Sequence, residues 1–279
     1  MELVYPPVIA FARTLFTVMG WRPQISGAEH VPASGGALIA ANHVGYLDFA
    51  FIGYGALPRR RLVRFLAKQE VFDHPVSGPL MRGMHHLPVD RFGGAVSVID
   101  TAVAALRAGE VVGLFPEGTI SRSFVPARAK TGAVRIAMQA QVPLIPCAVW
   151  GSQRLLTKGR RPNWQRNVPI VVSFGAPVPH AEGDAPAEVT DELMRRITAL
   201  VDEVAAAYPD APAGDDDAWW LPAHLGGRAP SVQEAAAAAD HERRQRLARR
   251  RAARADRSGR TERAEPADGA EAQGTTVDP

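Results

Sequence analysis

The chain has 279 residues, of which 46% are hydrophobic and 22% charged, and a formal net charge of +3. This length and hydrophobic content suffice for one sizeable core. The single cysteine, Cys147, excludes an internal disulfide and fits a reducing compartment, and no residue pattern suggests a metal site.

The first predicted element is an apolar segment over residues 5–20. Its apolar stretch runs over 12 residues, from Val8 to Met19, and follows Pro6 and Pro7, a pair that favours a helix start. A membrane-spanning helix needs about 20 residues, so this stretch is too short to span. Two interpretations have equal weight: a helix packed on the core, and a helix lying in a membrane interface.

Short apolar runs then alternate with helical patterns as far as residue 209. The predicted strands are Ala37–Ala41, Leu62–Ala67, His86–Val89, Val111–Phe115, Leu144–Trp150 and Val168–Phe174. Helices are predicted near 47–57, 76–83, 93–108, 131–140 and 187–207. This alternation predicts an α/β fold with a mostly parallel central sheet flanked by helices.

The composition changes sharply near residue 210. Residues 1–209 carry 21 Lys and Arg against 16 Asp and Glu, net +5, whereas residues 210–279 carry 11 against 13, net −2. We therefore predict one folded domain over residues 1–209 and a low-complexity, polar tail over 210–279 that is largely disordered or helical, with a helical part over 231–257.

Two features of the tail have alternative interpretations. Eight arginines lie between residues 243 and 257, a run that usually forms a solvated helix. Attachment to anionic lipid is the sharper alternative, and RNA binding is disfavoured because aromatic residues are not interleaved. Trp219-Trp220 could dock on the domain or lie at a membrane interface.

Polar groups follow directly on four of the predicted strands. They are Asn42-His43, Lys68, Asp90-Arg91 and Pro116-Glu117-Gly118-Thr119. In open α/β sheets, ligands bind outside the carboxyl ends of the strands. Parallel strands would therefore bring all four groups to one edge. Each group alone has a bland surface or structural interpretation, but their coincidence predicts a functional site.

His43 and Asp48, in the run NHVGYLD, are the candidate catalytic pair. An imidazole titrates at a pKa of about 6.5, which suits His43 to act as a general base near neutral pH. A turn at Val44-Gly45 would let Asp48 reach back and orient the ring, because glycine makes such a turn easy. Alternatively, Asp48 is a first-turn residue that interacts with its helix dipole.

The chain has no GxSxG motif that would present a serine nucleophile. We therefore expect the pair to activate a hydroxyl group of the substrate, so that acyl transfer proceeds by direct attack without a covalent enzyme intermediate.

The remaining candidates, Asn42 among them, would bind that substrate. Arg91 and Lys68 suit a phosphate, since arginine offers a planar fork and lysine a point charge. Gly118 permits close backbone approach, and Thr119 adds a hydroxyl group. Glu117 would hold Arg91 or Lys68, or accept from a glycerol hydroxyl; the alternative is a structural ion pair.

These motifs resemble those of the glycerolipid acyltransferases, the 1-acyl-sn-glycerol-3-phosphate O-acyltransferases and their relatives. The family's four blocks are matched in order by Asn42, His43 and Asp48, by Val89-Asp90-Arg91, by Phe115 to Thr119, and by Val142-Pro143-Leu144-Ile145-Pro146. Lys68 and Glu70 match a frequent Lys-x-Glu. The resemblance covers roughly residues 20–180.

The resemblance implies an acyltransferase that uses acyl-CoA or acyl carrier protein as donor and no further cofactor. His43 and Asp48 would be the catalytic pair, and Arg91, Glu117 and Gly118 would bind the acceptor's glycerol phosphate. We expect acylation of the sn-2 hydroxyl of lysophosphatidic acid to phosphatidic acid, by an enzyme peripheral on the cytoplasmic face of the cell membrane. A specific nucleic acid is not an expected partner.

Three positions depart from the family pattern, namely His85, Pro88 and Ile120. The family often has a glycine and an aromatic residue at the first two, and a cation at the third. The acceptor could therefore be another lysolipid or a glycolipid. A thioester hydrolase and a non-catalytic lipid-binding protein are the alternatives from other functional classes.

Overall fold

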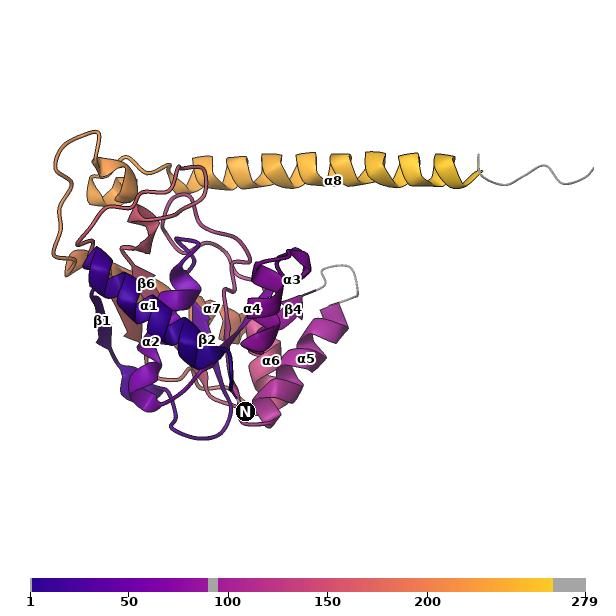
Figure 1. Ribbon diagram of the computed structural model, residues 1–279, viewed down its shortest axis with the longest axis horizontal. Coiled ribbons are helices and arrows are strands. Elements are labelled where there is room, and N and C mark those ends of the chain that lie inside the picture. Colours follow the sequence, from indigo (N-terminus) through magenta and orange to yellow (C-terminus); the bar gives the residue numbers. More distant parts are fainter. Residues whose placement is uncertain (1, 90–94, 263–279) are drawn as a thin grey trace, which may run out of the picture. The chain divides into compact units, whose positions relative to one another are not determined.

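The computed structural model describes residues 2–89 and 95–262. The chain divides into two units, Met1–Val232 and Gln233–Pro279. The first unit holds the sheet, and the second is described by one helix (Figure 1).

The first unit is built on a seven-stranded sheet with the order β1-β7-β6-β2-β5-β3-β4. The strands are β1 (Pro23–Ser26), β2 (Ala37–Ala41), β3 (Val63–Lys68), β4 (Leu87–Val89), β5 (Val111–Leu114), β6 (Leu144–Trp150) and β7 (Ile170–Phe174). All neighbouring pairs are parallel except β6 with β7. The prediction of a mostly parallel α/β sheet is confirmed. The carboxyl ends of β2, β3, β4, β5 and β6 therefore share one edge.

Helices flank the sheet. One layer contains α5 (Ala95–Arg107), α6 (Gly132–Ala140) and α7 (Pro186–Ala206), which pack side by side and contact β2, β5 and β6. The other face holds α2 (Asp48–Gly55), which contacts β1, β3, β6 and β7. The short α3 (Gln69–Asp73) and α4 (Ser77–Gly83) pair between β3 and β4. Right-handed crossovers place α2 opposite the α5–α7 layer.

Helix α1 (Tyr5–Met19) packs against the outer side of α2 (Figure 1). The Phe16 ring stacks on that of Phe51 with centroids 4.8 Å apart, and the Tyr5 hydroxyl donates to the Val63 carbonyl at 2.7 Å. The far side of α1 leaves Phe11 69% and Val18 55% exposed. One side of the predicted apolar helix thus packs on the core and the other faces outward. Within the described ranges, no helix is both long and apolar enough to cross a membrane.

The compact unit extends beyond the composition change at residue 210. Past α7 the chain returns to the body, where Trp220 is buried and the Arg154 guanidinium lies over its ring, 4.6 Å from the centroid. This settles Trp220 as a residue docked on the body. The boundary therefore falls at Val232 and not at residue 209, because a buried tryptophan and its partners join residues 210–232 to the fold.

Two further elements differ from the sequence patterns. Strand β1 is not predicted, because its four residues hold a proline and alternate between half-buried and exposed positions. Helix α8 (Val232–Glu262) runs five residues past the predicted end at 257 and starts one residue after its predicted start.

Candidate active site

The side chains of His43 and Asp48 meet across one turn at the carboxyl end of β2. His43 follows the strand, Asp48 opens α2, and His43 Nδ1 lies 2.8 Å from Asp48 Oδ2. The turn between them contains Gly45, where a Cβ would stand 3.0 Å from two atoms of Ser152. The structure shows the contact predicted from this turn, in which the Asp48 carboxylate lies against the His43 ring.

Asp48 is fully buried and accepts hydrogen bonds at both oxygens. Oδ2 accepts from the Val44 and Gly45 amides at 2.8 and 2.9 Å, and Oδ1 accepts from the Ser152 hydroxyl. A carboxylate already surrounded by donors acts only as an acceptor. His43 Nδ1 must therefore carry the proton that it shares with Asp48, which leaves the lone pair on Nε2. The side chain of His43 is 19% exposed, so a substrate can reach it.

The segment after β6 completes this arrangement, and the sequence analysis missed it. Ser152 opens the short helix η3 (Ser152–Arg154) and binds Asp48 across 104 positions of sequence. The Thr157 hydroxyl donates to the Val44 carbonyl at 2.6 Å, and the Tyr46 amide donates to the Leu156 carbonyl at 2.8 Å. Ligands bind outside the carboxyl ends of the strands in open α/β sheets. The same reasoning, applied to the end of β6, would have indicated Ser152.

An aromatic stack supports the imidazole from the neighbouring strand ends. The Phe115 ring lies parallel to that of His43, with centroids 3.9 Å apart and an interplanar angle of 12°. Phe65 on β3 stacks behind Phe115 at 6.0 Å. Gly113 on β5 makes room for Phe65, because a Cβ there would lie 2.5 Å from its ring. The stack limits the rotation of His43 to positions compatible with the Asp48 bond.

Glu117 holds two loops together through its carboxyl group. Oε1 accepts from the His43 amide and Oε2 from the Ala127 amide, both at 2.9 Å. Glu117 was expected to hold Arg91 or Lys68, or to accept from a glycerol hydroxyl, and the structure shows it binding these two backbone amides. The residue is only 8% exposed.

Burial raises the pKa of Glu117 to about 8, although the Ala127 and His43 amides oppose the rise. An unfolded chain releases this proton at a pKa near 4.5. The unfolded state therefore binds fewer protons over this window, and stability falls as pH rises from about 4.5 to about 8.

We expect the free energy of unfolding of the wild type to decrease from pH 5 to pH 8 relative to that of Glu117→Gln, which cannot titrate. Urea denaturation at several pH values measures this difference. The same substitution at Glu203, on the exposed side of α7, should leave the dependence of the free energy of unfolding on pH unchanged. If the wild type and Glu117→Gln showed the same dependence, the raised pKa of Glu117 would be contradicted.

Asn42 has a different place from the one expected. Its amide group donates to the Val149 carbonyl at 3.0 Å and accepts from the Val149 amide at 2.8 Å, and the side chain is fully buried. Expected as a substrate-binding residue, Asn42 instead joins the end of β2 to β6. Burial keeps it from touching a substrate.

The remaining candidates lie on the same edge where the structure describes them. Lys68 ends β3 and is exposed beside Val89 of β4. Gly118 has a φ of +69° with open space where a Cβ would lie, and Thr119 accepts from Lys158 Nζ at 3.4 Å. Arg91 lies outside the described residues. Lys158 is a further cation that the sequence analysis did not single out.

Comparison with known proteins shows what this arrangement is similar to. Residues 22–150 match the family model described as Acyltransferase. A Bacillus subtilis protein named 1-acyl-sn-glycerol-3-phosphate acyltransferase is 36% identical over 140 residues, which cover 49% of this chain and 68% of that protein. A Limnanthes douglasii protein of the same name is 30% identical over 158 residues, 56% of this chain and 54% of its own length.

A solved structure has the same fold. The crystal structure of the 1-acyl-sn-glycerophosphate (LPA) acyltransferase PlsC from Thermotoga maritima superposes with a TM-score of 0.60 at 23% identity, covering 74% of this chain and 81% of that one. At this identity the likeness concerns the fold. The Bacillus relative and the family model make the assignment: the chain belongs to the glycerolipid acyltransferase family and is an O-acyltransferase.

Proposed function

We propose that this protein transfers an acyl group from acyl-CoA or acyl carrier protein to the sn-2 hydroxyl of 1-acyl-sn-glycerol-3-phosphate, which gives phosphatidic acid for phospholipid biosynthesis. The observation that carries the proposal is the His43–Asp48 pair, with the His43 side chain 19% exposed at the carboxyl edge of the sheet. The names of the Bacillus and Limnanthes relatives support the choice of acceptor.

In the proposed reaction, His43 Nε2 removes the proton of the acceptor hydroxyl as its oxygen attacks the thioester carbonyl carbon. The new C–O bond forms, the C–S bond breaks, and the proton passes from His43 to the departing thiolate. Asp48 stabilises the imidazolium that exists between these transfers. The buried carboxylate and the Phe115 stack hold the ring in place throughout.

Direct attack by the acceptor is supported by the state of the nearby nucleophiles. The hydroxyl of Ser152 is buried and donates to Asp48. Cys147 is fully buried within β6, and burial raises the pKa of its thiol well above the usual value. A thiol attacks as the thiolate, so Cys147 is unsuited to form an acyl-enzyme.

The acceptor's phosphate would lie among the cations at the same edge. Lys68 stands at the end of β3, and Lys158 reaches Thr119 from the loop after β6. Arg91 follows β4 in sequence and would add a bidentate fork. Gly118, with open space where a Cβ would lie, would let the glycerol phosphate approach closely.

An acceptor panel tests this function. The purified protein is given one acyl-CoA together with lysophosphatidic acid, lysophosphatidylethanolamine, lysophosphatidylglycerol or a glycolipid acceptor, and products are identified by mass spectrometry. We expect phosphatidic acid to form with the highest kcat/KM. A higher value for a substituted headgroup would contradict the proposed acceptor while leaving acyl transfer in place.

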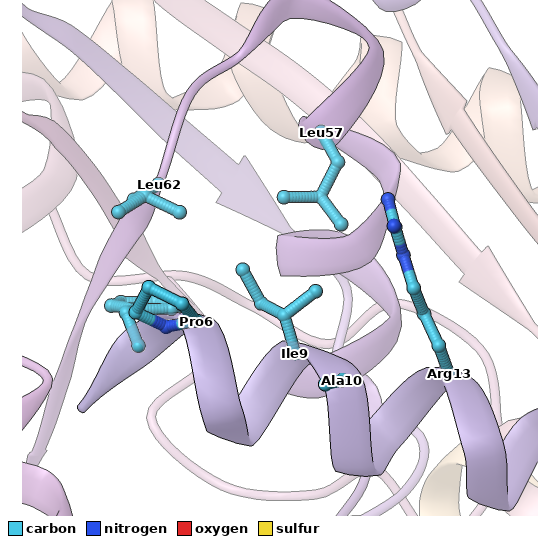
Figure 2. A pocket seen from close by; sticks show the side chains of 7 residues that line it. Pro6, Ile9, Ala10, Arg13, Leu57 and Leu62 are labelled. Carbon is cyan, nitrogen blue, oxygen red and sulfur yellow. The ribbon is translucent and has the colours of Figure 1, made fainter. Parts of the chain in front are cut away.

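We also propose that the protein acts as a peripheral enzyme on the cytoplasmic face of the cell membrane, docked through α1. Its outer side exposes Phe11 and Val18. Beside it opens a cavity of about 580 Å³, lined mostly by apolar residues of α1 and by Leu57 and Leu62, with Arg13 at one side (Figure 2). An apolar surface with an adjoining cation suits an anionic lipid interface.

Phe11→Asp should weaken binding to vesicles of phosphatidylethanolamine and phosphatidylglycerol by about tenfold or more, because burying one phenylalanine contributes roughly 1.5–3 kcal/mol. Co-sedimentation measures this partition. Leu225→Asp is the matched control, since Leu225 is an exposed leucine of a different element, η5 (Ala223–Leu225). Equal loss in both variants, or loss in neither, would contradict docking through α1.

A further inference from the structure

The turn η3 has side chains that point to two different parts of the molecule. Ser152, Gln153 and Arg154 are consecutive, polar and buried, with Arg154 only 3% exposed. Ser152 binds Asp48 of the catalytic pair. Arg154 binds the chain that returns past α7, over residues 208–220, here named the strap. A single rigid turn thus joins the candidate active site to the strap.

The strap binds Arg154 of η3 through one charged and two aromatic side chains. Arg154 Nη1 donates to Asp210 Oδ2 at 2.5 Å and to the Tyr208 hydroxyl at 3.2 Å. The guanidinium also lies over the Trp220 ring, which is 1% exposed and packs edge-on against Tyr208 at 5.6 Å. A buried arginine has to be paired to repay its desolvation. The strap supplies these partners and so fixes the position of the turn.

The strap is also held to the adjacent sheet edge. The Tyr208 hydroxyl donates to the Pro169 carbonyl at 2.7 Å, just before β7. Gly151, which precedes η3, has a φ of +91°, and a Cβ there would lie 2.1 Å from that carbonyl and 2.8 Å from the Tyr208 hydroxyl. The strap, η3 and the start of β7 are therefore tightly packed against one another, so a displacement of one would displace the others.

We propose that the strap positions the catalytic pair: Asp210, Tyr208 and Trp220 hold Arg154, and through the η3 turn they set the place of Ser152 against Asp48. The inference rests on the proposed acyl transfer. Asp210 and Arg154 are positioning residues that touch no reacting atom. Their contribution is to kcat, because a reactive group displaced by about 1 Å can cost a hundredfold in rate.

The first test is Asp210→Ala, which removes the charge that Arg154 binds. We expect kcat for acyl transfer to fall roughly tenfold to a hundredfold, while KM for acyl-CoA and for the acceptor stays within about twofold. Asp210→Glu should recover most of the rate. Asp215→Ala is the matched control, since Asp215 lies in the same strap but pairs with the exposed Arg228 and not with η3.

A double-mutant cycle shows whether the effect passes through Ser152. In a Ser152→Ala background, Asp210→Ala should cause little further loss of kcat, since the link to Asp48 is already absent. Additive losses would overturn the proposal. So would unchanged kcat in Asp210→Ala, or an equal loss in Asp215→Ala.

Folding is monitored by circular dichroism at the assay temperature. Should Asp210→Ala fail to fold, Asp210→Asn keeps an acceptor for Arg154 without the charge, and its kcat decides by the same criteria. A wild-type protein inactive with every acceptor would instead overturn the proposed function. The two failures are thus distinguishable.

Discussion

Replacement of His43 by alanine is expected to lower kcat roughly a thousandfold or more, because general-base catalysis by a positioned side chain contributes about 10²–10⁴-fold. The fold should persist, since among the described residues the imidazole makes one side-chain hydrogen bond and stacks on one ring. Phosphatidic acid formation from acyl-CoA and lysophosphatidic acid measures the loss. Circular dichroism and the thermal midpoint report whether the fold is intact.

The matched control is His180→Ala. The ring of His180 contacts the Val178 carbonyl, and Val178 bridges to Leu144 at the opposite edge of the sheet. This variant should turn over at the wild-type rate. Near wild-type turnover by His43→Ala would remove the base from the mechanism.

Asp48→Asn is expected to lower kcat roughly 10²- to 10⁴-fold with little change in structure. The amide oxygen can still accept from His43 Nδ1 and from the Val44 and Gly45 amides. The amide nitrogen can donate to the Ser152 hydroxyl, which then acts as an acceptor. What the variant loses is the negative charge that stabilises an imidazolium.

A second variant separates charge from geometry. Ser152→Ala keeps the negative charge of Asp48 and removes one of its hydrogen bonds, so its kcat for phosphatidic acid formation should fall less than that of Asp48→Asn. A kcat of Asp48→Asn equal to that of the wild type would contradict the proposed role of the charge.

Much of the fold follows from short-range patterns. The runs Ala37–Ala41 and Leu144–Trp150 are buried along their whole length, which is why an unbroken apolar sequence identified both strands with their observed bounds. β1 escaped notice because it is short and its packing depends on β7, about 147 positions away. The attachment of residues 210–232 to the body depends on the contact between Trp220 and Arg154. Amino-acid composition does not reveal a contact between two residues that are far apart in the sequence.

The site divides in the same way. The contact of His43 with Asp48 is local and the turn at Gly45 predicts it. The partners of Glu117 are backbone amides, including that of Ala127, ten positions further along the chain. The pattern of side chains in a sequence does not indicate which backbone amide will donate to a carboxyl group. The bond from Ser152 to Asp48 depends on β2 and β6 being neighbours, which only the strand order reveals.

The most direct test of the central claim, that His43 activates the acceptor hydroxyl for direct attack on the thioester, is rapid-quench measurement of thiol release from acyl-CoA with and without lysophosphatidic acid. We predict that release requires the acceptor, equals the phosphatidic acid formed, and leaves no acyl adduct on the intact protein by mass spectrometry. A stoichiometric burst of thiol with an acylated protein, or release at full rate without acceptor, would contradict it.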